Sequence, residues 1–194
     1  APNLLDSLKI KKTKLNLERY YFSKGWFDRK IDFIVDTLGN KRATLSYTIQ
    51  TGVPYKIRDI STAIETPILD SLYEKAKAAS IIKKEKQFDI VDFKEERNRL
   101  TAYFRNSGIY HFSQDYVSFE NDTINTNQNV DIKINIPNRI IRTQDSTTRV
   151  PFLAYRIKKV NVFTDATFKN RSKSTPKKTA INNNFKLYNY CDIK

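Results

Sequence analysis

The chain has 194 residues, of which 39% are apolar, and its 12 Phe and 11 Tyr supply enough large apolar side chains for a core, which excludes a disordered chain. Its 35 Lys and Arg against 21 Asp and Glu give a net charge of +14, which favours an anionic partner such as nucleic acid, lipid headgroups or an acidic protein. Cys191 is the single cysteine, which excludes an intrachain disulfide framework and a thiolate metal cluster, and no stretch approaches the ~20 apolar residues of a membrane-spanning helix.

Residues 1–52 predict a helix followed by a β-hairpin. Over residues 13–25 apolar side chains recur at helical spacing, with Thr13 as the expected N-cap and Gly25 as the residue that ends the helix. The period then changes to two, which is typical of a strand, and the turn "LGNKR" leads into a second alternating segment, "ATLSYTIQTG". The apolar residues that share a face are Ile31, Phe33 and Val35 in the first strand and Leu45, Tyr47 and Ile49 in the second.

Residues 53–138 predict a strand, two helices and a second hairpin. The strand is "VPYKIRDI", and Thr66 before a proline is a strong helix start, with the hydroxyl expected to cap the helix. Asp92 and Glu95 resemble a capping box that opens the second helix, which Gly108 ends. The segments "DYVSF" and "VDIKINI" then predict two strands on either side of a polar turn.

These two parts of the sequence repeat one another. Placing Gly25 on Gly108 superposes the helices and the first strands of the two hairpins at a constant offset of 83 residues, so that Phe33 falls on Tyr116. If four extra turn residues are allowed, Leu45, Tyr47 and Ile49 fall on Ile132, Ile134 and Ile136. The segment "YRIKKV" later repeats "YKIRDI". The repeat predicts three domains, namely a partial unit in 1–52, a complete unit in 53–138, and a polar linker with the start of a further unit in 139–194. Because the sequence contains no methionine, we expect a mature or excised piece of a longer protein.

The order strand, helix, helix, strand, strand and the motifs "YYFSKGWF" and "YFRNSGIYHF" resemble a known family. This family is the POTRA (polypeptide-transport-associated) domains of BamA-like and TamA-like outer-membrane assembly factors, the bacterial surface antigen superfamily. The resemblance covers most of residues 13–163, with Trp26 and Ile109 in place of the usual tyrosine. It implies an α+β fold of tandem β-α-α-β-β units, each a three-stranded mixed sheet covered by two helices.

The resemblance also implies a location and a class of partner. Such domains extend from the outer membrane into the periplasm, anchored by a barrel that this chain does not include, and receive unfolded outer-membrane proteins or periplasmic accessory proteins. In the family the second strand of the unit lies at the sheet edge, where an extended segment adds as a further strand beside a groove under the second helix. We expect no catalytic residue, cofactor or metal. The candidate edge residues are Ile31, Phe33, Val35, Tyr116, Val117, Ser118 and Phe119.

Several conspicuous residues have simple structural interpretations. The two glycines that end helices supply a positive φ, and the residues that follow them are expected to fill the helix–sheet core rather than line a groove, namely Trp26, Phe27, Ile109 and Tyr110. Glu95 and Glu96 complement the dipole of the predicted second helix from its first turn. His111 is the only histidine and has no suitably spaced carboxylates for a metal, and Cys191 lacks a histidine partner for nucleophilic chemistry.

Other functions are compatible with the sequence. A POTRA-like scaffold in a two-partner secretion or division machine would hold a fixed partner, and an open strand edge would then only abut a neighbouring domain. The basic segment "FKNRSKSTPKK", with cations interleaved among aromatics elsewhere, suits a nucleic-acid binder, although no recognised nucleic-acid module is present and the aromatics fall at core spacing. The same segment also suits anionic lipid headgroups or an acidic accessory protein.

Overall fold

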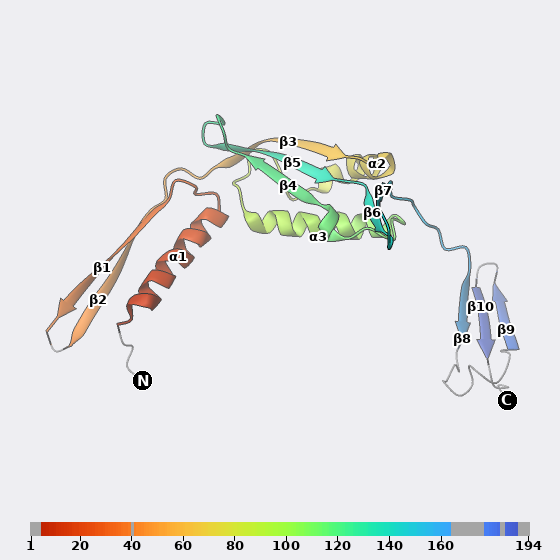
Figure 1. Ribbon diagram of the computed structural model, residues 1–194, viewed down its shortest axis with the longest axis horizontal. Coiled ribbons are helices and arrows are strands. Elements are labelled where there is room, and N and C mark those ends of the chain that lie inside the picture. The colour runs from red at the N-terminus through yellow and green to blue at the C-terminus, as the bar shows by residue number, and fades with distance from the viewer. Residues whose placement is uncertain (1–4, 40, 164–176, 183–184, 190–194) are drawn as a thin grey trace. The chain divides into compact units, whose positions relative to one another are not determined.

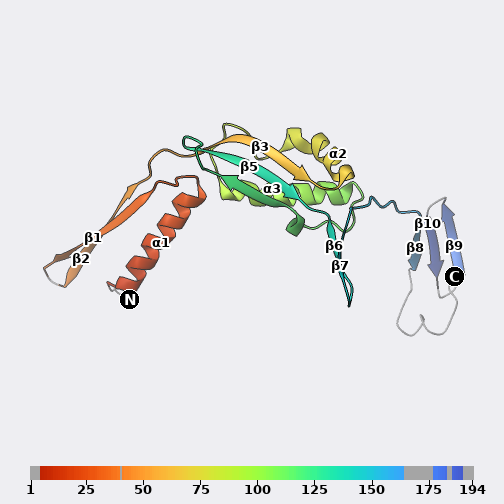
Figure 2. The ribbon, with the colours of Figure 1, turned by 45° about the horizontal axis from the view of Figure 1, so that its top comes forward.

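The computed structural model describes residues 5–39, 41–163, 177–182 and 185–189, with side chains described as far as Val160. The chain divides into two compact units, residues 1–154 and 155–194, and each is described by itself. Figures 1 and 2 show the helices and strands of both units. Among the described residues, no helix combines the length and the apolar character needed to cross a bilayer.

The first helix, α1 (Ser7–Ser23), begins seven residues before the predicted start. Asp6 is its N-cap, because the carboxylate accepts hydrogen bonds from the backbone N–H groups of Leu8, at 2.9 Å, and Lys9, at 3.3 Å. The prediction of Thr13 as the cap is wrong. Thr13 lies inside the helix, where its hydroxyl donates to the carbonyl of Lys9 at 2.9 Å.

Both long helices end in the same way at a glycine. Gly25 has φ +88° and Gly108 has φ +94°. At the end of α1, the N–H of Gly25 donates to Phe22 O at 3.1 Å and the next N–H reaches back to Tyr21 O at 3.1 Å. After α3 (Ile90–Asn106), the equivalent bonds run to the equivalent carbonyls, both at 3.0 Å. These pairs of bonds form Schellman motifs, which confirms that the two glycines end helices 83 residues apart.

The predicted first hairpin is present as β1 (Lys30–Leu38) and β2 (Arg42–Gln50), which pair antiparallel with Phe33 opposite Tyr47. Figure 1 shows α1 running alongside this ribbon. Ile10 of α1 and Ile31 of β1 are buried, and the hydroxyl of Tyr47 donates to the carbonyl of Ile10 at 3.3 Å. The predicted alternation is therefore confirmed, since the apolar face of β1 is the more buried one.

Three strands form the central sheet, namely β3 (Lys56–Ile64), β4 (Ser118–Asp122) and β5 (Asn129–Ile136). Their order is β3-β5-β4, so that β5 lies in the middle, parallel to β3 and antiparallel to β4. The four apolar residues that alternate along β5 are all buried, namely Val130, Ile132, Ile134 and Ile136. The prediction of a three-stranded mixed sheet in residues 53–138 is thereby confirmed.

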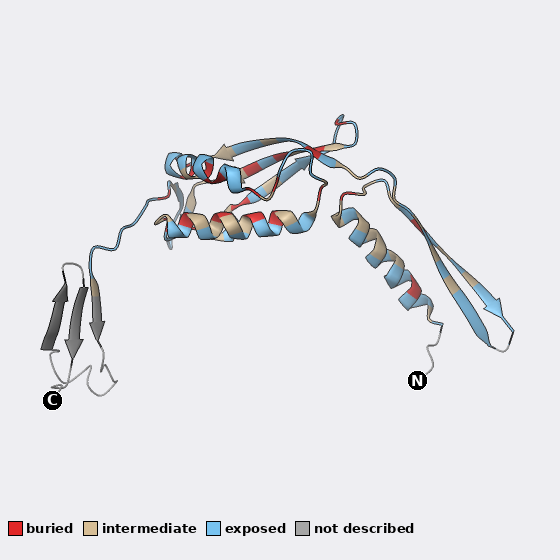
Figure 3. Ribbon diagram, turned by 180° about the vertical axis from the view of Figure 1, so that it is seen from behind, coloured by how far each residue is buried: buried red, intermediate tan, exposed pale blue. Residues whose placement is uncertain are grey.

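Two helices cover the apolar face of the central sheet: α2 (Pro67–Ala76), which a 3-10 turn continues over Lys77–Ala79, and α3. Figure 3 shows buried residues at intervals along α3 and in the strands of the central sheet, between exposed ones. One cluster fills the space between them, and it includes Ile57, Leu69, Tyr73, Phe93, Leu100, Phe104, Ile109 and Phe112. Burial of this cluster is the main stabilising contribution to the unit.

Two predicted helix caps differ from the structure. Thr66 is at the N-cap of α2, but its hydroxyl donates to Asn138 Oδ1 at 2.7 Å instead of capping the helix. The N-cap of α3 is Asp89, which accepts from Val91 N–H at 3.0 Å, so the predicted capping box at Asp92 is wrong. Asp92 is the third residue of α3 and forms an ion pair with Lys86 at 2.7 Å.

Residues 139–154 were predicted to be a polar linker, but they contain a hairpin of β6 (Arg139–Arg142) and β7 (Thr147–Val150). The residues after the hairpin return to the core, where Phe152 is buried and its N–H donates to the hydroxyl of Thr66 at 3.2 Å. This segment is therefore part of the folded unit.

The second unit contains β8 (Val160–Phe163), β9 (Lys177–Asn182) and β10 (Phe185–Asn189). Its order is β8-β10-β9, with β10 parallel to β8 and antiparallel to β9. This is the order and polarity of the central sheet, with the last strand in the middle. The repeated segments differ in their placement, since "YKIRDI" lies in β3 from Lys56 onward, whereas "YRIKKV" precedes β8 and overlaps it only at Val160.

Candidate functional site

The two outer strands of the central sheet differ in how well their edges are covered. The start of β3 is covered by residues 85–88, because Ile57 N–H donates to Lys86 O at 2.9 Å and Glu85 N–H donates to Ile57 O at 2.8 Å. In the part of the chain that the structure describes, β4 pairs with β5 alone. Alternate residues of an edge strand direct their N–H and C=O groups away from the sheet, so β4 is open to a further strand.

The open strand begins later than predicted. Tyr116 belongs to a 3-10 turn, Gln114–Tyr116, and Val117 ends that turn, so neither residue is in a strand. The ring of Tyr116 packs on Phe112 and Phe152, at centroid distances of 5.9 Å and 4.9 Å. Of the four candidate edge residues in this hairpin, only Ser118 and Phe119 lie in β4.

The turn also changes the correspondence between the two hairpins. Phe119 is opposite Ile134, as Phe33 is opposite Tyr47. Since Tyr47 corresponds to Ile134, Phe33 corresponds to Phe119 and not to Tyr116 as predicted. The extra turn residues before β4 shift the offset at this point.

A groove runs between the edge of β4 and the first half of α3, as predicted. We call it the β4 groove; its volume is about 750 Å³ and it is lined by Ile90, Val91, Phe93, Lys94, Arg97, Gln114, Asp115, Val117 and Ser118. Ile90 and Val91 are 53% and 46% exposed at its rim, although both are large apolar residues. Phe93 is buried in its floor, where its ring packs on that of Phe119 at 5.0 Å. The groove therefore offers apolar contacts beside an open strand edge.

Arg97 is the charged residue that the fold holds in place within the β4 groove. Its Nε donates to the carbonyl of Val117 at 2.9 Å, and its guanidinium lies 5.6 Å from the centre of the Phe119 ring. Lys94 is more exposed, and Asp115 is exposed on the opposite side. Sequence reasoning missed Arg97, because only the fold brings it from α3 to the end of the turn before β4.

A buried carboxylate fixes α3 to the rest of the unit. Glu96 is fully buried, and it accepts hydrogen bonds from Arg99 Nε at 2.8 Å, Ser80 Oγ at 3.0 Å and Ile81 N at 3.0 Å. Burial raises the pKa of Glu96, but the hydrogen bonds from Arg99 and from the backbone outweigh it and hold the pKa below its ordinary value. Arg99 also donates to the carbonyl of Ala76 at 3.2 Å. The predicted role of Glu96 in a first turn is wrong, since Glu96 anchors the helix that forms one wall of the β4 groove.

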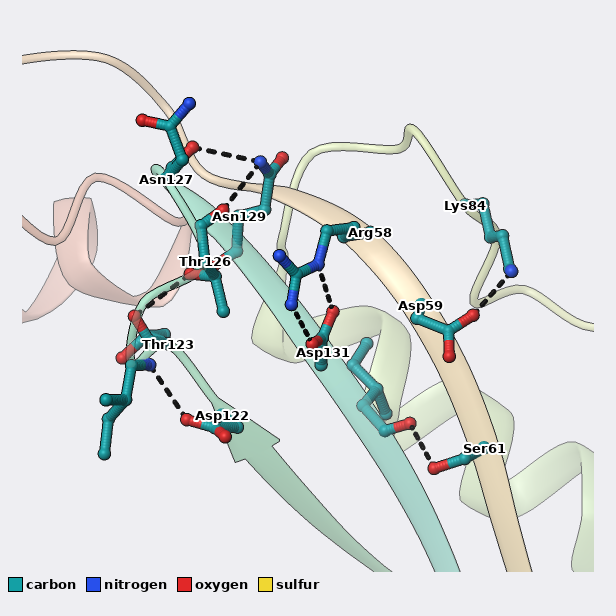
Figure 4. A network of polar contacts seen from close by, with 12 residues as sticks. Arg58, Asp59, Ser61, Lys84, Asp122, Thr123, Thr126, Asn127, Asn129 and Asp131 are labelled. Carbon is teal, nitrogen blue, oxygen red and sulfur yellow. Dashed lines mark hydrogen bonds and ion pairs between the residues drawn. The ribbon is translucent and has the colours of Figure 1, made fainter.

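Polar contacts link the strands at the end of the central sheet that carries the turn between β4 and β5 (Figure 4). Arg58 forms two hydrogen bonds with Asp131 across β3 and β5, and Lys84 pairs with Asp59 at 2.5 Å. In the turn between β4 and β5, the hydroxyl of Thr126 bonds to Thr123 O and Asn129 O. This end of β4 is thus held by its own hairpin turn, which leaves the outer edge as the accessible side.

The residues after the two helix-ending glycines have different environments. Ile109 is buried in the core, as predicted, and Phe27 packs on Tyr55 and Phe88 at centroid distances of 4.8 Å and 5.2 Å. Trp26 contacts Tyr21 edge to face at 5.7 Å. Tyr110 is 68% exposed, so its prediction as a core residue is wrong. The residue after Ile109 points outward because Ile109 itself occupies the core position.

The end of α1 and the start of the central sheet meet at a joint formed by residues 24–28, Tyr55 and 85–89. Tyr55 N–H donates to Gly25 O at 2.9 Å, and Gln87 Nε2 donates to Lys24 O at 2.7 Å. Lys24 also pairs with Asp89 at 2.5 Å. The first hairpin is therefore connected to the central sheet by backbone and side-chain bonds, and not only by the chain.

The remaining candidate residues bring no chemistry together. Ile31, Phe33 and Val35 lie on the face of β1 that carries the buried Ile31, while the outer edge of β1 has no paired strand among the described residues. His111 is exposed, and the described residues contain no group of three or more His, Cys, Asp or Glu side chains arranged for a metal. Cys191 and the basic segment 168–178 have no described side chains.

No family model and no curated protein sequence matches the chain. Among solved structures, it is similar to POTRA domains 3–5 of BamA from Haemophilus influenzae, with 13% identity, a TM-score of 0.41, and coverage of 97% of this chain and 82% of that one. It is also similar to BamA from Haemophilus ducreyi lacking POTRA domains 1–3, with 15% identity and a TM-score of 0.39. That match covers 73% of this chain and 25% of the other. Both solved structures are of BamA.

Proposed function

We propose that this chain is a non-catalytic polypeptide-binding region that captures an extended segment by adding it as a strand to the edge of β4. The supporting observation is that β4 is unpaired on its outer side in the described structure and runs beside the β4 groove, where Ile90 and Val91 are exposed. Backbone hydrogen bonds at the edge would bind many sequences, while the groove would add apolar contacts. Glu120 and Asp122 place charges on the short strand, which limits non-specific pairing.

The biological setting of this proposal comes from the sequence motifs. Their resemblance to POTRA domains supports a tandem arrangement of units on the periplasmic side of the outer membrane, in a factor that assembles or translocates β-barrel proteins. The partners would then be unfolded outer-membrane proteins or periplasmic accessory proteins. The edge of β1, with Ile31, Phe33 and Val35, is a second candidate edge in the same chain.

Proline substitutions at two neighbouring positions of β4 test the strand addition. Backbone N–H groups of neighbouring strand residues point to opposite sides, so one of Glu120→Pro and Asn121→Pro removes an outward N–H and the other removes a bond to β5. The variant that loses the outward N–H should remain folded and bind a synthetic barrel-strand peptide roughly tenfold more weakly, since a hydrogen bond and close approach are lost. Fluorescence anisotropy gives the affinity, and circular dichroism with thermal unfolding gives the fold.

The matched control is Lys133→Ala on β5, which removes an exposed ion pair with Glu120 but leaves the backbone N–H and C=O groups of the β4 edge unchanged. We expect it to bind the peptide with native affinity. Native affinity in both proline variants, with the fold intact, would show that the peptide does not add to β4.

A further inference from the structure

Arg97 lies where the side chain of a strand bound to β4 would enter the β4 groove. Ser118, Glu120 and Asp122 are exposed on one face of β4, while Phe119 packs toward the core on the other. A strand added beside β4 alternates in the same way, so every second side chain of the ligand faces α3. Arg97 and Phe119 are in contact at this face.

The guanidinium of Arg97 is held in place but its donors are only partly used. Its Nε is bonded to Val117 O at 2.9 Å, and in the described structure no carboxylate lies within ion-pair distance of it. Its side chain is half-buried, so an ion pair there is less screened by solvent than one on the surface. Arginine in such a position presents its terminal nitrogens as a fork that fits a carboxylate.

The spacing of the groove residues defines a pattern in the ligand. Phe93 and Arg97 both line the groove and are four residues apart on α3, so they share a face of the helix and are about 6 Å apart along it. Alternate side chains of a strand are about 7 Å apart, which is close to that distance. A ligand with an apolar residue at one position and an acidic residue two positions away would therefore contact both Phe93 in the groove floor and Arg97.

We propose that Arg97 determines specificity by selecting extended segments that carry a carboxylate two residues from an apolar side chain on the same face. This inference rests on the strand addition proposed above. Lys94 is exposed, so an ion pair with it is more screened by solvent and contributes less, and Asp115 on the opposite side of the groove disfavours a carboxylate placed near it. The acidic residue is thus directed to Arg97 and not to the groove as a whole.

A double-mutant cycle tests this selection. The probes are two blocked peptides of about nine residues that alternate threonine and valine, with the central valine replaced by glutamate in one and by glutamine in the other. Native protein should bind the glutamate peptide about tenfold more tightly, as expected for a charge-assisted hydrogen bond. For Arg97→Gln the ratio should fall below about twofold, and for Lys94→Gln it should stay near tenfold.

The glutamine peptide separates selection from a structural role of Arg97. It should bind native protein and Arg97→Gln equally, and loss of both peptides in the variant would assign Arg97 a structural role and overturn the proposal. If both peptides bind native protein equally, strand addition stands and the carboxylate selection is refuted. If neither peptide binds native protein, strand addition fails and the selection fails with it.

Discussion

Gly25 combines two requirements at the joint between the first hairpin and the central sheet. Its φ of +88° belongs to the left-handed region, which side chains other than glycine adopt at a cost. A Cβ atom at this position would lie 2.9 Å from Phe88 O and 3.3 Å from Tyr55 O, both backbone atoms of the joint. The glycine therefore ends α1 and also allows the close approach of the next unit.

Gly25→Ala should destabilise the protein by about 2 kcal/mol or more, because the backbone strain and the clash with Phe88 O act together. Gly39→Ala is the matched control, since a Cβ there meets nothing within 4 Å. We expect the control to be neutral or slightly stabilising. Denaturant unfolding measures both, and equal stability of the two variants would contradict the role given to Gly25.

Glu96→Gln should cost about 3 kcal/mol near neutral pH, because it leaves Arg99 without its buried carboxylate. The folded-state pKa of Glu96 lies below the ordinary value of 4.5, so the contribution of the charged form is fully present above that value and is lost as the pH falls through the lower folded-state pKa. The difference in unfolding free energy between native protein and variant should therefore shrink below about pH 4. Urea unfolding across this pH range measures it, and a difference independent of pH would refute the charged state of Glu96.

At the scale of the elements, helix starts are set by the residues whose side chains reach free N–H groups. Asp6 and Asp89 do so, whereas Thr13, Thr66 and Asp92 have other partners. The sequence identified the first residue of α2 but not those of α1 and α3, because several candidate caps lie within one or two turns of each other. The local backbone decides which of these residues becomes the N-cap.

Asp6→Ala should lower stability by about 1 kcal/mol, because two N–H groups of α1 lose their acceptor. Thr13→Ala should have little effect, since its hydroxyl bonds only within the helix. Circular dichroism and thermal unfolding of both variants check the order of the effects. A larger loss of stability in Thr13→Ala than in Asp6→Ala would instead support the helix start predicted at Thr13.

The candidate site shows where prediction from the sequence succeeds and where it ends. The alternation around Ile132 and Ile134 predicted β5 as a strand, and the resemblance to POTRA domains implied that Ser118 and Phe119 lie at a sheet edge. Tyr116 was assigned to the strand because its spacing after Gly108 matches that of Phe33 after Gly25. Spacing alone does not reveal the inserted 3-10 turn, or the contacts that Arg97 and Glu96 make with residues far away in the sequence.

At the scale of the whole molecule, the central folded unit extends beyond the predicted boundary at residue 138. The ring of Phe152 packs on Phe112 at 5.3 Å, and its N–H bonds to Thr66. Arg149 lies 3.7 Å from Glu65. The hairpin of β6 and β7 thus leads the chain back to the core, and a division at residue 138 removes a buried aromatic side chain.

A fragment of residues 53–154 should unfold cooperatively, since nearly all of the core lies within it. A fragment of residues 53–138 should be less stable by about 3 kcal/mol, as should Phe152→Ala in the longer fragment, because both lose the same buried ring. Urea unfolding compares the three proteins. If the shorter fragment is as stable as the longer one, Phe152 does not belong to the core of this unit.

The position of β5 in the middle of the central sheet has a consequence for biosynthesis. β5 is the last of the three strands to leave the ribosome, and neither β3 nor β4 pairs with the other. Until residue 136 has emerged, both outer strands lack their hydrogen-bonding neighbour and the apolar sides of α2 and α3 have no sheet to cover. In the same way, β8 and β9 lack the strand with which they pair until β10 has emerged. We therefore expect each sheet of this nascent chain to need protection from aggregation until its closing strand arrives.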